Sequence, residues 1–298
     1  LRCATHVHQK TGMDNLCLAG GVALNCVGNG RILREGPFKN IWIQPAAGDA
    51  GGALGVALFM WHQLLGNART PATPDNQQGS MLGPSFARQE TENFLADQSA
   101  RYQHYDSEEE LCQVIARHLA DQKVVGLMQG RMEFGPRALG NRSILGDPRS
   151  EKMQALMNLK IKFRESFRPF APSILREHAH EYFDMSPEDE SPYMLLVAPV
   201  QEDKRNNSES IDELTGLDQR KVVRSCVPAI THVDCSARVQ TVDPVRHPRY
   251  HKLISRFKQL TGCPLVINTS FNVRGEPIVC TPADAYRCFM ATNMDVLV

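Results

Sequence analysis

The stretch LCLAGGVALNCVGNGRILREGPFKNIWIQP, residues 16–45, decides the fold class. It opens with a short apolar run at 16–19 and closes with another at 40–45, and a longer segment with helical spacing, 22–34, lies between them. Glycines after the first run and a proline at the end of the second mark turns. Short apolar strands that alternate with longer periodic segments are typical of an α/β protein.

The same alternation continues outside this stretch. Residues 66–84, GNARTPATPDNQQGSMLGP, hold three prolines and three glycines among small polar residues, which is typical of an interdomain linker. We therefore predict one domain over 1–65 and a second over 85–298. Further expected elements are helices at 1–12, 49–65, 86–99, 107–122 and from 281, strands at 123–128, 191–200, 237–242 and 264–268, and a charged surface loop at 201–221.

The composition excludes several classes of protein. The 298 residues carry a formal net charge of zero, which argues against coating nucleic acid or an anionic membrane by bulk electrostatics. Nine cysteines without a CxxC pair favour a reducing cytoplasm over a disulfide framework or a thiolate zinc site. No apolar run approaches the roughly 18 to 20 residues that a membrane span needs. The chain also starts inside a helical pattern and stops inside a strand pattern, so we expect it to be part of a longer one.

Positive charge is concentrated locally. Residues 123–176 contain eleven Lys or Arg against four acids, mostly in GRMEFGPRALGNRSILGDPR (130–149) and KIKFRESFR (160–168). In the second segment Phe163, Phe167 and Phe170 alternate with charges on a predicted helix that prolines then stop. The plain alternative is that these charges form a solvated helix face. Because the aromatic residues would hold the cations beside a core, we favour contacts with a phosphorylated small ligand. We expect anion contacts from Arg137, Lys162 and Arg168, and regard Arg164 as equally open to either role. We expect Arg142 to pair with Glu133 or brace the loop, and Arg131 and Arg149 to be surface charge.

Three loops allow two interpretations each. GGVALN (20–25) could hold a phosphate or ribose at a helix start, or simply be a tight turn. Asp49 could cap a helix or bind a metal ion beside nucleotide phosphates. NTSFN (268–272) could meet a ligand at a strand end, or form ordinary side-chain turns. The residues alone leave these alternatives open.

Taken together and in order, the motifs resemble one family. They resemble the ATP-dependent O-carbamoyltransferases that modify nodulation factors and antibiotics. The resemblance implies the end of an actin-like ATPase domain in 1–65 and a YrdC-like α/β domain in 85–298. It also implies formation of carbamoyl adenylate from carbamoyl phosphate and ATP, and transfer of the carbamoyl group to an acceptor hydroxyl. The motifs are GGVALN, QPAAGDAGGALG, EFGPRALGNRSIL, KFRESFRPFAPS, THVDCSARVQTV and NTSFNVRGEPIVCTPADA.

The resemblance also assigns roles by position. It implies catalytic roles for Lys162 and Arg168 and a divalent metal, iron or magnesium, at Asp49. It implies a nucleotide turn at Gly20, Gly21 and Asn25. The implied carbamoyl phosphate and ATP clamp is Arg137, Lys162, Arg164, Arg168, Arg238, Ser270 and Asn272.

Two departures from the family pattern matter. The family's other metal ligands are two histidines of an HxxxH helix, which is not found before Asp49, since His6 and His8 have the wrong spacing. Family members usually carry glycine where this chain has Cys235, so we expect a modest backbone adjustment in that turn.

Two other functions are open to the same residues. The basic region could bind structured RNA, as in the related threonylcarbamoyl-type tRNA-modifying enzymes, although the neutral charge and the short basic stripe disfavour nucleic acid. An inactive scaffold is the third hypothesis, and the retained clamp residues argue against it. The sequence leaves the acceptor, the metal and the oligomeric state undetermined.

Overall fold

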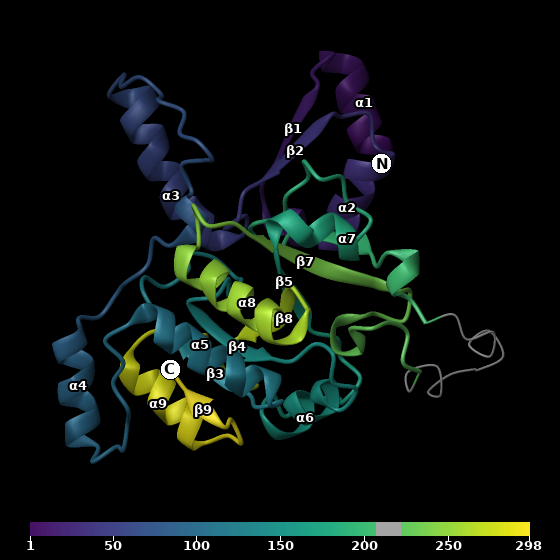
Figure 1. Ribbon diagram of the computed structural model, residues 1–298. Helices are drawn as coiled ribbons and strands as arrows, with labels where there is room; N and C mark the ends of the chain where they lie inside the picture. Colours follow the sequence, from purple (N-terminus) through teal and green to yellow (C-terminus); the bar gives the residue numbers. More distant parts are fainter. Residues whose placement is uncertain (207–221) are drawn as a thin grey trace.

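The computed structural model describes residues 1–206 and 222–298 and has the mixed α/β architecture expected from the alternation of strands and helices (Figure 1). The described residues form a two-stranded sheet in the first part of the chain and a seven-stranded sheet in the second. The charged loop expected over 201–221 falls mostly on 207–221, which lie outside the described residues. The predicted α/β class is therefore confirmed.

The first part follows the predicted order, with one break. Strands β1 (Asn15–Leu18) and β2 (Asn40–Ile43) pair in parallel. The helix expected over 22–34 is interrupted at Asn25, because the Asn25 side chain accepts the N–H of Gly28 and starts a new helix there. The remaining elements are α1 (Arg2–Thr11), a 3-10 helix (Gly21–Leu24), α2 (Cys26–Glu35), α3 (Asp49–Phe59) and a π-helical turn (Met60–Leu64).

The seven-stranded sheet has the order β6-β7-β5-β8-β4-β3-β9. Neighbours β5 and β7, and β3 and β9, run parallel, whereas the other pairs are antiparallel. Its central strands β4 and β5 were not among the predicted strands, and the strand expected over 191–200 forms only in its second half. The strands are β3 (Val125–Met128), β4 (Arg142–Gly146), β5 (Ala171–Leu175), β6 (Leu196–Pro199), β7 (Ser236–Val242), β8 (Leu265–Ser270) and β9 (Val296–Leu297).

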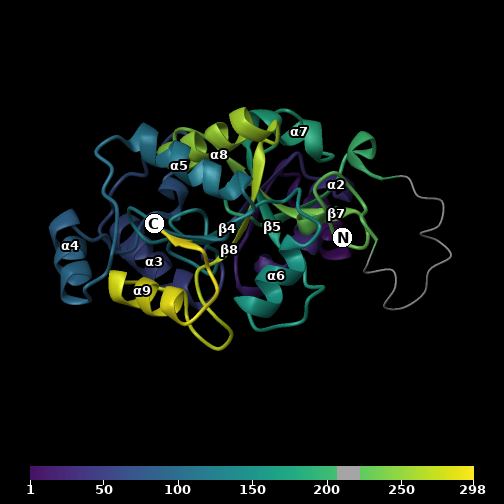
Figure 2. The same ribbon diagram turned by 60° about the horizontal axis from the view of Figure 1, so that its bottom comes forward.

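Helices cover both faces of this sheet. Figure 2 shows α5 and α8 on one side and α6 and α9 on the other. Helix α8 turns Tyr250, Leu253, Ile254 and Phe257 into the core, a spacing that follows one face of a helix. The helices are α4 (Arg88–Asp97), α5 (Glu108–Ala120), α6 (Met153–Lys160), α7 (Ala179–Tyr182), α8 (Pro248–Thr261) and α9 (Pro282–Met290), with 3-10 helices at Gln78–Ser80, Arg176–His178, Glu202–Lys204 and Pro228–Ile230.

The first part docks on the β6 edge of the large sheet. Asn29 of α2 donates its side-chain amide to the carbonyl of Leu195, and Arg34 donates to the carbonyl of Val197. A Cβ at Gly30 would lie 2.5 Å from the Val197 oxygen, so only glycine allows α2 to approach this closely. The contact brings the start of α2 beside the loop that carries Arg137.

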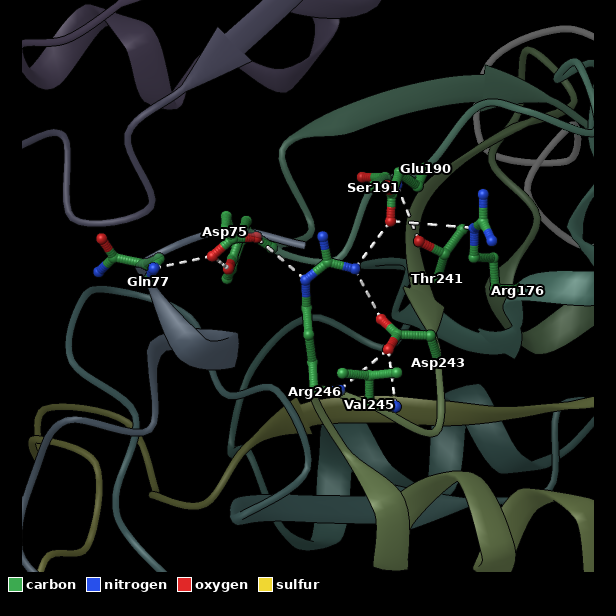
Figure 3. Close-up of polar contacts among 10 residues, drawn as sticks. Asp75, Gln77, Arg176, Glu190, Ser191, Thr241, Asp243, Val245 and Arg246 are labelled. Carbon is green, nitrogen blue, oxygen red and sulfur yellow. Dashed lines mark hydrogen bonds and ion pairs between the residues drawn. The ribbon is translucent and has the colours of Figure 1, made fainter. Parts of the chain in front are cut away.

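Residues 66–84 are fastened to the second part by a buried ionic network. Arg246 lies between Asp75 on one side and Asp243 and Glu190 on the other (Figure 3). Asp75 also accepts the hydroxyl of Tyr193 at 2.8 Å. Buried charged groups need partners of opposite charge, so separating Asp75 from Arg246 would be costly. The network therefore holds the predicted linker against the part of the chain that contains the large sheet.

Helix α3 contrasts with the rest of the fold. Neither α3 nor the turn Met60–Leu64 buries a side chain, and Val56, Phe59 and Trp61 are exposed. In Figure 1 this helix projects away from the sheets. Within residues 1–206 and 222–298, no helix combines the length and the apolar character that crossing a bilayer requires.

Candidate functional site

Lys162 is the centre of a compact polar cluster. It follows the end of α6, where its N–H donates to the carbonyl of Met157, and its side chain is only 5% exposed. The Nζ atom lies 2.5 Å from the Ser270 carbonyl oxygen, and 2.8 Å from both the carbonyl and the side-chain oxygen of Asn272. Burial, and then the positive charge of Arg164, lower the pKa of Lys162 to about 7.

The sequence-predicted helix over 160–168 does not form. Helix α6 ends at Lys160, and the following loop has Phe163 in the left-handed region at φ 47°. Phe163 and Phe167 are exposed, so of the three aromatic residues only Phe170 is buried. The prediction that these aromatics pin a helix beside the core was therefore wrong, because the Asn158 side chain of α6 donates to the carbonyls of Ser166 and Arg168 and holds the segment as a loop.

Two arginines of this loop, Arg164 and Arg168, differ in how firmly the protein holds their side chains. Arg164 stacks over the Phe170 ring, 4.9 Å from its centroid, and donates to the Asn158 side chain at 2.6 Å. Burial and the nearby Arg168 lower its pKa. Arg168 is half-exposed, and its nearest ionic partner is Glu165 at 3.9 Å. Arg164 is thus fixed, whereas Arg168 can reach a ligand.

These residues share one cavity. A hollow of about 260 Å³ is lined by five of the predicted positions together with Arg274. Arg274 was missed by the sequence reasoning, although it lies two residues after the NTSFN motif and its charge was visible. The lining also includes one acid, Glu165, against four cations, and this excess of positive charge suits a polyanionic ligand. The predicted residues that line it are Lys162, Arg164, Arg168, Ser270 and Asn272.

Arg137 and Arg238 lie beside this cavity, where the second part meets the first. Arg238 is on β7, and burial followed by the charge of Arg137 lowers its pKa to about 10, with Arg164 adding to the effect. Burial also lowers the pKa of Arg137, whose Nη2 lies 3.5 Å from the Leu24 carbonyl oxygen. The guanidinium groups therefore form a row from the cavity to the turn before α2.

The other arginines of the glycine-rich segment are bonded internally. Arg142 is fully buried and donates to the carbonyls of Gln129, Gly130 and Asn141, so it braces the loop. Arg149 pairs with Asp147 at 2.6 Å, and Arg131 donates to the carbonyls of Leu82 and Gly83. Of the four arginines in this segment, Arg137 is the one without a short hydrogen bond or ion pair among the described residues.

The predicted nucleotide turn has ordinary helix-start geometry. Gly20 adopts φ 91°, which favours glycine, and Gly21 begins the 3-10 helix. The side chain of Asn25 already accepts the N–H of Gly28, so it serves as a helix cap in the described state. The turn nevertheless faces the row of guanidinium groups, because Arg137 contacts Leu24 within it.

Asp49 is exposed at the first turn of α3, with Gly48 as the N-cap residue and no side-chain cap bond. Among the described residues, no group of three or more His, Cys, Asp or Glu is arranged to hold a metal ion. Asp49, the metal ligand that the family resemblance implies, is therefore not part of such a group among the described residues.

Cys235 occupies a backbone conformation that glycine adopts more easily. Its φ is 56°, and its N–H donates to the His232 carbonyl in the turn before β7. The turn therefore keeps the left-handed conformation, and the side chain is accommodated at some cost.

Comparison with known proteins places the sequence among carbamoyl-transfer proteins. Residues 1–58 match the model of the carbamoyltransferase N-terminus, and residues 116–298 match that of the carbamoyltransferase C-terminus. An uncharacterised protein of Synechocystis sp. is 58% identical over 100% of this chain and 48% of its own length. Nodulation protein NolO of Bradyrhizobium diazoefficiens is 43% identical over 98% of this chain and 50% of its own.

Nodulation protein NolNO of Sinorhizobium fredii is 42% identical over 98% of this chain and 40% of its own length. The chain thus spans about half the length of the curated relatives it matches. A crystal structure of full-length HypF superposes on 64% of this chain and 20% of its own with a TM-score of 0.40 at 15% identity, too low a likeness to carry an argument.

Proposed function

The chain belongs to the carbamoyltransferase family, and from that premise we propose that its second part forms carbamoyl adenylate from carbamoyl phosphate and ATP. In the balanced reaction, water first cleaves carbamoyl phosphate to carbamate and phosphate. A carbamate oxygen then bonds to the α-phosphorus of ATP, the bond between the α-phosphorus and the bridging oxygen to the β-phosphate breaks, and pyrophosphate leaves. An acceptor hydroxyl then takes the carbamoyl group and AMP leaves. The acceptor is a small molecule or a glycan.

The observation that carries this proposal is the shared cavity of Lys162, Arg164 and Arg168 with Ser270 and Asn272. Carbamoyl phosphate and ATP are both polyanions, so bringing them together requires cations that offset their repulsion. Lys162 and Arg168 would contact the reacting phosphoryl and carbamoyl oxygens directly. Arg137 and Arg238 would continue the clamp toward the first part.

The finer architecture is part of the same proposal. The first part would be the end of an actin-like ATPase domain, with Gly20, Gly21 and Asn25 near the nucleotide, and the second a YrdC-like domain. Asp49 would supply one carboxylate to a divalent ion, iron or magnesium. Its other ligands would lie outside the described residues, among which no group of three or more His, Cys, Asp or Glu is arranged to hold a metal ion.

Exchange of labelled pyrophosphate into ATP, dependent on carbamoyl phosphate, tests the adenylation step. We expect exchange in the intact protein, and its loss in Arg137→Ala and Lys162→Ala variants that keep the wild-type circular dichroism spectrum. Absence of exchange under any metal condition would sink the proposal. Full exchange in either variant would remove that residue from the site.

A further inference from the structure

The segment that carries Arg137 is held by the side chain of Glu133, which belongs to the same segment. The Oε1 atom of this buried carboxylate accepts the backbone N–H groups of Leu139 at 2.6 Å, Asn141 at 2.9 Å and Arg142 at 3.3 Å. Successive N–H groups that converge on one point form a concavity suited to an anion. Here the protein's own carboxylate fills that concavity. The backbone N–H groups of Leu139, Asn141 and Arg142 are therefore not available to a phosphate.

Two buried amides hold the loop from the opposite side. Gln240 of β7 donates to the Leu139 carbonyl at 2.9 Å, and Asn268 of β8 donates to the Ala138 carbonyl at 3.0 Å. Asn268 also donates to the Gln240 side chain at 2.8 Å, and Ser173 donates to the same oxygen at 2.5 Å. The segment directly after Arg137 is thus fixed through both its N–H and its carbonyl groups.

Arg137 needs such support, because its own contacts are weak. Its hydrogen bond to the Leu24 carbonyl is long, at 3.5 Å, and its buried Nε has no hydrogen-bond partner among the described residues. Its neighbour Arg238 is also positive, so the two side chains repel each other in the absence of an anion. The backbone must therefore hold the Arg137 side chain in its position beside Arg238.

We propose that Glu133 is the positioning residue of the anion site and acts through Arg137, with Gln240 and Asn268 completing the support from the sheet. The three residues do not touch substrate. They set the curvature of residues 133–142, and so hold the Arg137 guanidinium near Arg238 before any ligand binds. The inference rests on the proposed function for the identity of the ligand, and on the hydrogen bonds alone for the position of Arg137.

A double-mutant cycle tests this inference on the 298-residue chain. The Kd for carbamoyl phosphate is measured by calorimetry in the wild type, Glu133→Ala, Arg137→Ala and the double variant. We expect Glu133→Ala alone to weaken binding about tenfold, and to cause no further loss once Arg137 is already alanine, since residues that act through one another are not additive. Additive losses would mean that Glu133 acts through general stability, and would overturn the inference.

Asp147→Asn is the matched control. Asp147 is also a buried carboxylate, but it pairs with Arg149 at the end of β4. We expect wild-type affinity from this variant, and no dependence on the residue at 137. If Glu133→Ala does not fold, Asn268→Ala replaces it in the cycle, because that change leaves every charge in place. The same non-additivity is expected, with a smaller loss of about threefold.

A readout without ligand separates this inference from the proposed function. The Nε–H resonance of Arg137, assigned by its absence in Arg137→Ala, reports the order of that side chain. We expect it to shift or broaden in Glu133→Ala and to stay in place in Asp147→Asn. If the wild type binds no carbamoyl phosphate, the proposed function fails and the resonance alone decides. An unchanged resonance in Glu133→Ala would overturn the positioning role.

Discussion

The segments 130–149 and 161–169 both place a cation in the interior, and the charges around the two cations differ in sign. Arg142 and Lys162 each donate to backbone carbonyls, and burial lowers the pKa of both. The next influence on Arg142 is the negative charge of Glu133, which raises its pKa, whereas the next on Lys162 is the positive charge of Arg164, which lowers it. The charge of Arg142 is thus balanced by an acid of the protein, whereas the charge of Lys162 is not.

This difference separates structural cations from candidate ligand contacts. Arg149 with Asp147, and Arg246 with Asp75 and Asp243, belong with Arg142, since acids of the same chain balance them. The residues at the cavity are balanced by few acids, and their repulsion decreases only when an anion arrives. A buried cation among cations is therefore the better guide to an anion site than the number of basic residues in a segment.

The largest effect is expected from Arg142→Ala. Removing this buried guanidinium leaves several carbonyls without a hydrogen-bond donor, and the Glu133 carboxylate without a neighbouring positive charge. This should lower the free energy of unfolding by about 3 to 5 kcal/mol. Urea denaturation measures the change. Arg131→Ala, which removes bonds from an exposed arginine, is the control and should cost less than about 1 kcal/mol. Equal denaturation midpoints for Arg142→Ala and the wild type would show that Arg142 is not a structural cation, and would contradict the comparison of the two segments.

Lys162→Met should show the opposite pattern, with lost activity and a preserved fold. We expect pyrophosphate exchange to decrease by about a hundredfold or more, the range for removing one preorganised charge contact. The free energy of unfolding should change by less than about 1 kcal/mol, because water in the cavity can reach the acceptors that Lys162 leaves. Lys160→Met, an exposed lysine at the end of α6, should keep full activity. Unimpaired exchange in Lys162→Met would show that this buried cation is structural.

The pH dependence of binding sharpens the same comparison. The pKa of Lys162 falls from an ordinary 10.5 to about 7 in the folded protein, so burying its charge opposes folding fully below pH 7, and this opposition fades as the pH rises toward 10.5. An anion needs the charged form. Above pH 7 the Kd for carbamoyl phosphate should therefore increase, by up to about tenfold per pH unit. Calorimetry from pH 6 to 9 should find this slope in the wild type, and a flatter one in Lys162→Met. The same slope in both would assign the titration to another group.

The smallest effect is expected from Cys235→Gly. The left-handed φ of 56° is strained for a side-chain-bearing residue, so glycine should raise the free energy of unfolding by about 0.5 to 1 kcal/mol. A thermal melt of the two proteins measures it, and anion binding should not change. A lower melting temperature for the glycine variant would mean that contacts of the cysteine side chain outweigh the backbone strain.

Local patterns predicted some elements and missed others for identifiable reasons. Strand β4 was hidden because Arg142 and glycines flank its short apolar run, and β5 because Pro169 precedes it and Pro172 lies within it. Helix α8 could have been found, since Tyr250, Leu253, Ile254 and Phe257 follow helical spacing between Pro248 and Gly262. The segment 160–168 was predicted as a helix from its spacing, but contacts from Asn158 to the carbonyls of Ser166 and Arg168 fold it as a loop.

The sequence by itself determined the α/β class, the local excess of positive charge and the family motifs, because these depend on residue types and spacing along the chain. Only the tertiary structure decided which cations are already balanced. Glu133 lies close to its partners in sequence, but Gln240 and Asn268 reach the same loop across 101 and 130 residues. Charge can be counted in a sequence, whereas hydrogen bonds over such separations exist only after the sheet has formed.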